Sequence, residues 1–310
     1  MNQSIWQELK YRYQNGGMIT RLIFINLIVF VAYYGGVSII WLFDNAFSDM
    51  IAGKLMSFIS LPEDPATLVT RPWTFFTYMF MHSGLWHILF NLLVLYWFGS
   101  ILTNYLSDRK VLPIYIYGGL FSGLLFIAAY NFLPTFASVN GTLIGASGAV
   151  LAIVFAAATL VPDHSIHLLF VGAVRIKYIA LIILLLQFIN LKGGNAGGNF
   201  AHIGGALFGF LFIKQLQNGR DWSIGFNWAV DKLSNLLNFN RKAPRIKIVY
   251  SDKEKASRKW VRKSKNKAEQ TSRQDQIDQI LDKINQSGYE SLSKEEKDFL
   301  FRASREVKDE

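Results

Sequence analysis

The sequence of 310 residues contains no cysteine, which excludes disulfides, thiolate metal ligands and a cysteine nucleophile. Acidic residues are also missing where the chain is most apolar, because Asp163 is the only one between Asp108 and Asp221. Clustered carboxylates are therefore excluded from this stretch, both as metal ligands and as partners of a histidine. Basic residues are plentiful, since 32 Lys and Arg against 22 Asp and Glu give a formal charge of +10.

Two parts of the chain differ in composition. Long apolar runs fill the chain up to about residue 216, whereas the remainder is polar and mostly basic. The first part carries too few charges for a water-soluble domain, so a lipid bilayer is its expected solvent. The polar N-terminal lead, residues 1–21, lacks the apolar core and the cleavage site of a signal peptide, and we expect the first span to stay attached.

Six apolar segments approach the roughly 20 residues that a helix needs to cross a bilayer. They are residues 22–43, 84–106, 112–132, 142–162, 173–190 and 199–216. This pattern predicts an all-α polytopic membrane protein. The connection of about 40 residues between the first two segments carries apolar side chains among a few charges. We interpret it as an amphipathic hairpin in the outer interface, with an ordinary folded loop as the alternative.

The distribution of lysine and arginine predicts the orientation of these spans. Basic residues precede the first span, lie between the second and third and between the fourth and fifth, and follow the sixth. The opposite side has only Lys54, Arg71 and Lys192. Because basic connections tend to stay in the cytoplasm, we expect both termini to be cytoplasmic.

Polar side chains within the spans gather at one predicted depth. His87 and Asn91 lie one helical turn apart, on one face at the start of the second span, and His82 precedes that span. Ser147 lies near the start of the fourth span and His202 near the start of the sixth. Taken singly, each has an ordinary explanation as a packing, interfacial or interhelical residue. Together they predict one polar pocket that is open to water from the outer side.

Ser147 and His202 pair a nucleophile with a base, because a neighbouring imidazole can take the proton of a serine hydroxyl. No carboxylate is available to orient His202, so the pattern predicts a Ser/His dyad rather than a triad. Free backbone N–H groups at the start of the fourth helix favour a developing oxyanion near Ser147. Close helix packing around the pair is predicted from four glycines, namely Gly145, Gly148, Gly205 and Gly209.

These residues form three motifs, in the order His82-x-x-x-x-His87-x-x-x-Asn91, Gly145-x-Ser147-Gly148 and Ala201-His202-x-x-Gly205-x-x-x-Gly209. On the second, fourth and sixth spans, they resemble the rhomboid intramembrane serine proteases over about residues 20–216. The resemblance implies a six-helix rhomboid-like membrane domain over residues 22–216, with Ser147 as the nucleophile and His202 as the general base. It also implies that His87 or His82, together with Asn91, helps to hold the oxyanion.

The same resemblance implies a serine endopeptidase of the bacterial inner membrane that cuts other membrane proteins near the outer end of their spans, without a metal or cofactor. Three positions depart from the family's pattern, and one of them lies around Thr103, where the family commonly has an acidic residue near the end of the second span. Thr74 stands where the family often has an arginine after the tryptophan, here Trp73. Leu151 stands where an aromatic ring often stacks on the catalytic histidine. These departures concern stability and loop anchoring and leave the dyad intact.

The polar part of the chain is predicted to hold a basic juxtamembrane linker, residues 217–270, and a small cytoplasmic helical hairpin, residues 271–310. Between residues 241 and 267, twelve Lys and Arg stand against two acidic residues, which predicts contact with anionic lipid headgroups rather than with nucleic acid. Ser293 and Glu296 have the spacing of a capping box, which predicts the start of the hairpin's second helix.

Two other functions stay open. A non-catalytic relative that binds membrane clients would use the same fold, although such relatives usually lack the serine or the histidine. A metal or ion transporter could use His82, His87 and His202, but carboxylate or thiolate ligands and HExxH spacing are missing. The sequence identifies neither the substrate nor the oligomeric state.

Overall fold

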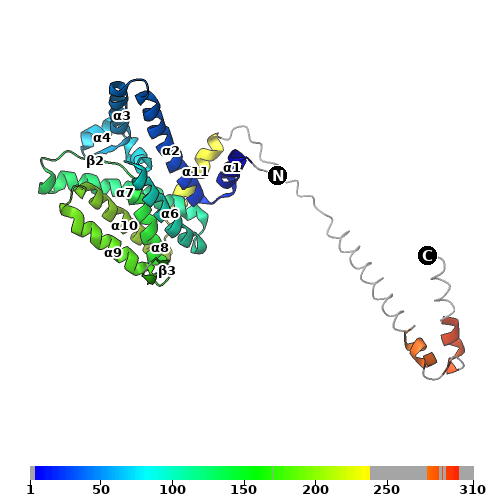
Figure 1. Ribbon diagram of the computed structural model, residues 1–310. Helices are drawn as coiled ribbons and strands as arrows, with labels where there is room; N and C mark the ends of the chain where they lie inside the picture. Colours follow the sequence, from blue (N-terminus) through cyan, green and yellow to red (C-terminus); the bar gives the residue numbers. More distant parts are fainter. Residues whose placement is uncertain (1–3, 170, 238–277, 286–287, 289–290, 300–310) are drawn as a thin grey trace. The chain divides into compact units, whose positions relative to one another are not determined.

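The computed structural model describes residues 4–169, 171–237, 278–285, 288 and 291–299 (Figure 1). The chain divides into two compact units, residues 1–238 and residues 239–310. The first unit contains the apolar helices and is called the membrane unit below.

Most of the described membrane unit is helical, which confirms the all-α polytopic fold class. Its main helices are α1 (Ile5–Asn15), α2 (Met18–Trp41), α6 (Leu85–Tyr105), α7 (Val111–Phe132), α8 (Ser147–Leu160), α9 (Ile176–Ile189), α10 (Ala196–Gln217) and α11 (Ser223–Leu237). Between α2 and α6 lie α3 (Asn45–Ile59), β1 (Leu61–Pro62), α4 (Pro65–Thr70), α5 (Thr74–Thr77) and η1 (Tyr78–Phe80). The other short elements are η2 (Asp108–Lys110), η3 (Pro134–Phe136), β2 (Thr142–Leu143), β3 (Ser165–Leu168), β4 (Gly172–Arg175) and η4 (Asn190–Lys192).

Four helical segments in the described residues are long and apolar enough to cross a bilayer, namely α2, α6, α7 together with η2, and α10. Helices α8 and α9 have only 14 residues each. The predicted bounds of the fourth and fifth spans, 142–162 and 173–190, were therefore wrong. Strand pairing explains the difference, because β2 pairs with β1 ahead of α8, and β3 pairs with β4 between α8 and α9.

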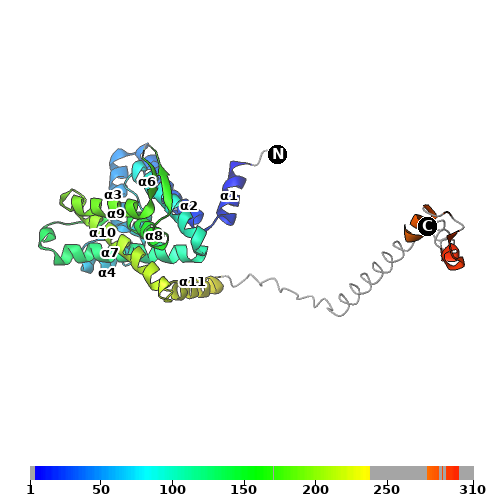
Figure 2. The same cartoon turned by 90° about the horizontal axis from the view of Figure 1, so that it is seen from below.

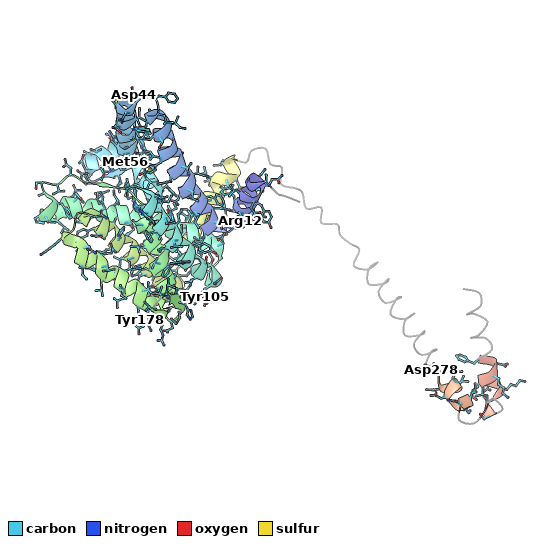
Figure 3. All side chains as sticks on the ribbon, in the orientation of Figure 1. Arg12, Asp44, Met56, Tyr105, Tyr178 and Asp278 are labelled. Atoms are coloured by element: carbon cyan, nitrogen blue, oxygen red, sulfur yellow. The ribbon has the colours of Figure 1, made fainter. Side chains whose placement is uncertain are left out.

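The helices run back and forth between two ends of the membrane unit. Tyr105 at the end of α6 and Tyr178 near the start of α9 lie at one end, whereas Asp44 just before α3 lies at the other (Figure 3). Since α6 ends where α9 begins, α6, α8 and α10 all start at the end that carries Asp44. The predicted polar residues of these helices therefore share that end of the unit.

Helix α8 packs against α6, α7 and α10. Ten of its residues are buried, and most of them are small. A helix of 14 residues is about 21 Å long, shorter than the roughly 30 Å hydrocarbon core of a bilayer. Non-helical backbone that includes Gly145 and the fully buried Ala146 directly precedes Ser147. Such backbone is tolerated at membrane depth when protein surrounds it.

Glycines let α10 pack directly on the backbone of α8. A Cβ atom on Gly205 would overlap the carbonyl oxygen of Gly148, and one on Gly209 would overlap that of Ala152. On the other side of α8, a Cβ atom on Gly148 would overlap Ser122 Oγ of α7. Small residues permit this close approach between helices in a bilayer, where van der Waals packing drives association. The contact places the first turns of α10 beside the first turn of α8.

The predicted outer hairpin is helix α3 followed by the short helices α4 and α5. Arg71 Nη1 donates a hydrogen bond to the Ser57 carbonyl oxygen at 3.0 Å, and Trp73 Nε1 donates to that of Phe58 at 2.9 Å. The Trp73 ring also packs on the Phe58 ring, with centroids 4.8 Å apart. Thr74 Oγ1 donates to the Arg71 carbonyl oxygen at 2.7 Å. The loop is therefore anchored by Arg71 and Trp73, although Thr74 departs from the rhomboid pattern.

The linker predicted over residues 217–270 begins with a helix instead, since α11 lies within it (Figure 2). The Asp221 carboxylate accepts a hydrogen bond from the Ser223 N–H at 2.9 Å and another from Lys110 of η2. Burial by itself would raise the pKa of Asp221, but the bonds from Lys110 and Ser223 outweigh it and hold the pKa below its usual value. A second ion pair joins Arg109 to Asp231. These contacts hold α11 against the α6–α7 connection. The basic composition of residues 217–270 had indicated a linker and not a helix.

In the second unit, residues 278–285 and 294–299 are helical. The Ser293 N–H donates to Glu296 Oε2 at 2.7 Å, and the Glu296 N–H donates to Ser293 Oγ at 3.2 Å. The predicted capping box is thereby confirmed. The basic segment 241–267 lies outside the described residues, so its contact with anionic lipid stays a prediction.

Replacing Gly205 by alanine should destabilise the membrane unit by about 1–3 kcal/mol, because the added methyl group would overlap the backbone of α8. Gly35→Ala is the matched control, since Gly35 lies in α2 and a Cβ atom there would meet nothing within 4 Å. Thermal unfolding in detergent measures both. Equal melting of Gly205→Ala and the wild type would contradict the packing described above.

Candidate active site

Ser147 and His202 are in hydrogen-bonding contact. Ser147 is the first residue of α8, and His202 lies in the second turn of α10. Ser147 Oγ lies 2.6 Å from His202 Nε2. The glycine-mediated packing of α10 on α8 brings these two side chains together from positions 55 residues apart in the chain. A hydroxyl at this distance from an imidazole nitrogen has the geometry of an activated nucleophile.

Gln187 of α9 makes a second contact with the imidazole. Gln187 Oε1 lies 2.7 Å from His202 Nδ1, so both ring nitrogens have a protein partner. Gln187 was not among the site residues predicted from the sequence. It had a usable signal, because a glutamine in an otherwise apolar part of a membrane helix is costly unless it has a partner. Leu151 stands where the family pattern often has an aromatic ring. It is buried at the wall of a cavity that Gln187 and His202 also line.

The His87 imidazole faces Ser147 with a defined tautomer. The backbone N–H of Ser83 donates to His87 Nδ1 at 3.3 Å, and the Ser83 hydroxyl lies 2.9 Å from the same nitrogen. A backbone N–H can only donate, so Nδ1 accepts and the neutral ring carries its proton on Nε2. His87 therefore presents an N–H donor at its other nitrogen.

Gly145 is the point where His87 and Ser147 approach each other. A Cβ atom there would lie 3.0 Å from His87 Nε2 and 3.4 Å from Ser147 Oγ. The φ angle of Gly145 is +127°, a conformation that L-residues rarely adopt. Its N–H donates to the Tyr78 carbonyl oxygen at 2.9 Å, which fixes the segment ahead of α8. The site thus needs glycine at this position both for the backbone and for space.

Asn91 and His82 differ in their position relative to Ser147. Asn91 is largely buried and lines the same cavity as Ser147 and His202. Its Nδ2 donates a hydrogen bond to the His87 carbonyl oxygen at 2.8 Å. The second Nδ2 proton is still available for another acceptor. His82 is fully buried, with its ring centroid 5.2 Å from that of His87. His82 does not line either of the two cavities that contain Ser147.

Two cavities meet at the Ser147–His202 pair. The larger, about 650 Å³, is lined by residues of α6, α8, α9 and α10, among them Trp86, Phe90 and Ile183. The smaller, about 290 Å³, includes Thr142, Leu143 and Ile144 ahead of α8. Ser147 and His202 line both.

The lining of the two cavities carries no carboxylate, and its ionisable side chains are His87 and His202. Within the described residues, no three His, Cys, Asp or Glu side chains are grouped so as to hold a metal ion. What the site offers is a hydroxyl, an imidazole in contact with it, and nearby N–H donors. This combination is suited to nucleophilic attack on a carbonyl group and to holding the resulting oxyanion.

Comparison with known proteins places this site in a family. Residues 69–217 match the rhomboid domain. The chain therefore contains a rhomboid domain. The rhomboid match runs from within α4 to the end of α10 and contains every candidate site residue, from His82 to Gly209. Residues 264–306 match a second family, DUF6576, whose function is unknown.

The rhomboid relatives are distant. The chain is 27% identical over 137 residues to the human presenilin-associated rhomboid-like protein, mitochondrial, covering 43% of this chain and 35% of that protein. It is 30% identical over 154 residues to RHOMBOID-like protein 1 of Arabidopsis thaliana, covering 47% and 36%. It is 32% identical over 96 residues to the rhomboid protease GlpG of Salmonella newport, covering 31% and 34%. The matches span about a third of the length of these relatives. Together with its apolar helices, the rhomboid domain makes this chain an integral membrane protein.

Gly145→Ala should destabilise the rhomboid domain by about 1–3 kcal/mol, because a side chain strains the backbone at positive φ and crowds His87. Gly84→Ala is the control, since Gly84 precedes α6 in extended backbone and a Cβ atom there meets nothing within 4 Å. Differential melting of the two variants tests this expectation. A Gly145→Ala protein as stable as Gly84→Ala would show that the positive φ angle is not required.

Proposed function

We propose that this rhomboid-domain protein is an intramembrane serine endopeptidase, with Ser147 as the nucleophile and His202 as the general base. The observation that carries the proposal is the 2.6 Å contact between Ser147 Oγ and His202 Nε2. Its position where two cavities meet supports the proposal, because a substrate can reach the pair. One relative is itself named a rhomboid protease.

The proposed reaction has two halves. Ser147 Oγ attacks the carbonyl carbon of the substrate peptide bond while its proton passes to His202 Nε2, giving a tetrahedral oxyanion. The imidazolium then gives this proton to the leaving amine, and the C–N bond breaks to leave an acyl-enzyme. Water, deprotonated by His202, attacks the ester carbonyl, and the proton returns to Ser147 as the acid product leaves.

The oxyanion would form within reach of two kinds of donor. Backbone N–H groups in the first turn of α8 have no intrahelical acceptor and lie beside Ser147. The neutral His87 ring directs its Nε2–H toward the same place, and Asn91 has a remaining amide proton. We assign His87 and Asn91 to oxyanion stabilisation and give His82 a supporting role beside the His87 ring.

The larger cavity supports a proposal for the substrate class. Its walls are mainly apolar, with Trp86, Phe90 and Val94 from α6 facing Ile183 from α9. An extended apolar segment fits such a cleft, whereas an intact helix keeps its backbone groups paired internally. We therefore assign the activity to transmembrane segments that unwind locally near one end. We propose that this end faces the outer side of a bacterial inner membrane and that both termini are cytoplasmic, because the basic connections gather on the opposite side of the spans.

A fluorophosphonate probe should label the wild-type protein in detergent and should label neither Ser147→Ala nor His202→Ala. The probe reacts only with a serine whose hydroxyl is activated by a base. Melting temperatures close to the wild type would show that both variants are folded. Labelling of Ser147→Ala equal to the wild type would exclude Ser147 as the nucleophile. A folded wild type without labelling or cleavage would instead favour the non-catalytic, client-binding alternative.

His87→Ala should lower kcat for a fluorogenic transmembrane peptide by about 10²–10³, the usual cost of losing one oxyanion donor. KM should change little, because the donor acts mainly on the charge that develops during the reaction. His87→Gln keeps an N–H donor and should lose less. A folded His87→Ala protein with wild-type kcat would remove His87 from the proposed oxyanion site.

A further inference from the structure

A continuous chain of hydrogen bonds runs from Ser147 through His202 to α9. Ser147 Oγ contacts His202 Nε2 at 2.6 Å, and His202 Nδ1 contacts Gln187 Oε1 at 2.7 Å. Gln187 Nε2 then donates to the carbonyl oxygen of Ile183 at 3.1 Å. The direction of each bond in this chain can be worked out from its last member.

The Ile183 carbonyl oxygen determines which way the Gln187 amide faces. A carbonyl oxygen can only accept, so the NH₂ group of Gln187 must point toward Ile183. The Oε1 atom of Gln187 is then the atom that faces His202. Assigning an amide from its hydrogen-bond network in this way is the usual test of its orientation.

The amide in turn determines the tautomer of His202. Gln187 Oε1 can only accept, so His202 Nδ1 must carry the proton in the neutral ring. His202 Nε2 then has a free lone pair facing the Ser147 hydroxyl. This is the tautomer that a general base needs, because only a lone pair on Nε2 can take the serine proton. With the other tautomer, lone pairs of Nδ1 and Oε1 would face each other.

We propose that Gln187 is a positioning residue that holds His202 in the tautomer and orientation required of a base. It acts through the imidazole and does not contact the reacting atoms. The inference rests on the proposed function in one respect, the use of His202 as the base.

The surroundings explain why an amide can fill this place. Between Asp108 and Asp221 the chain has no acidic residue except Asp163, which pairs with Arg175 and Lys177. A carboxylate buried beside the histidine would be costly in a bilayer, whereas a neutral amide supplies the same acceptor without a charge. Among the side chains that line the two cavities, the only titratable group facing His202 from another helix is His87 of α6.

Three variants of α9 separate this role from a packing role. Gln187→Met keeps the length and approximate volume of the side chain and removes the acceptor. Gln187→Glu keeps an acceptor oxygen whether or not the new group is ionised. Leu186→Met is the control, because Leu186 is the adjacent residue of α9, is 47% exposed and does not line the larger cavity.

The decisive measurement is ¹⁵N NMR of histidine-labelled protein, at a pH where the imidazole is neutral. Comparison with His202→Ala assigns the His202 signals. The wild type, Leu186→Met and Gln187→Glu should show His202 protonated on Nδ1. Gln187→Met should shift a large share of the population to the Nε2-protonated form. A wild type protonated on Nε2, or the same tautomer in Gln187→Met as in the wild type, would overturn the proposal.

Kinetics give the second readout. Gln187→Met should lower kcat on the order of 10-fold with little change in KM, a loss typical of one neutral hydrogen bond. Gln187→Glu should recover most of the rate, and Leu186→Met should match the wild type. Equal losses in the Met and Glu variants would show that packing, and not the acceptor, matters at this position.

The two proposals fail in different ways. If the wild type neither reacts with fluorophosphonate nor cleaves a membrane substrate, the protease proposal fails, yet the NMR comparison still decides whether Gln187 sets the His202 tautomer. If the wild type cleaves substrate but Gln187→Met keeps the tautomer and the rate, only the role of Gln187 is removed.

Discussion

The close packing of α10 on α8 is the contact on which the rest of the membrane unit depends. At Gly205 and Gly209 a single added methyl group would overlap carbonyl oxygens of α8, so the two backbones lie as near as glycine allows. Lipid surrounds such helices with material as apolar as their own side chains, and shape therefore does more than hydrophobicity to hold them together. This contact sets the 2.6 Å distance between Ser147 and His202, which a small shift of either helix would break.

The site shows how polar chemistry is stabilised where water and carboxylates are scarce. Each ring nitrogen of His202 has a partner, His87 Nδ1 is paired with Ser83, and the amide of Asn91 is paired with the backbone of its own helix. A buried polar group without a partner is costly, and hydrogen bonds in a low-dielectric interior strengthen one another. Neutral partners satisfy these groups without placing a charge in the bilayer. The same partners determine which nitrogen of His87 and of His202 carries the proton.

Much of the site could be predicted from the sequence, because polar residues are rare in a membrane span and are therefore informative. A serine and a histidine at similar predicted depth were enough to pair Ser147 with His202, and helical spacing joined His87 to Asn91. The sequence alone did not show which of these residues lie next to one another in the folded protein. The family resemblance left the oxyanion role open between His87 and His82, and only the structure shows that His87 lines both cavities whereas His82 lines neither. Gln187 belongs to no motif. A glutamine in an apolar membrane helix indicates that a partner exists, but only the structure shows that this partner is His202.

By itself the sequence determined the membrane solvent, the helical class and the residues able to do chemistry, since these follow from apolar length and from the cost of polar groups in lipid. Only the tertiary structure decided the short lengths of α8 and α9, because strand pairing between distant segments sets where each begins or ends. It also decided that α11 is a helix held by ion pairs, and which way each imidazole faces. Hydrogen-bond direction and close contact are properties of pairs of residues. A sequence contains both members of each pair, but it does not show whether they are in contact.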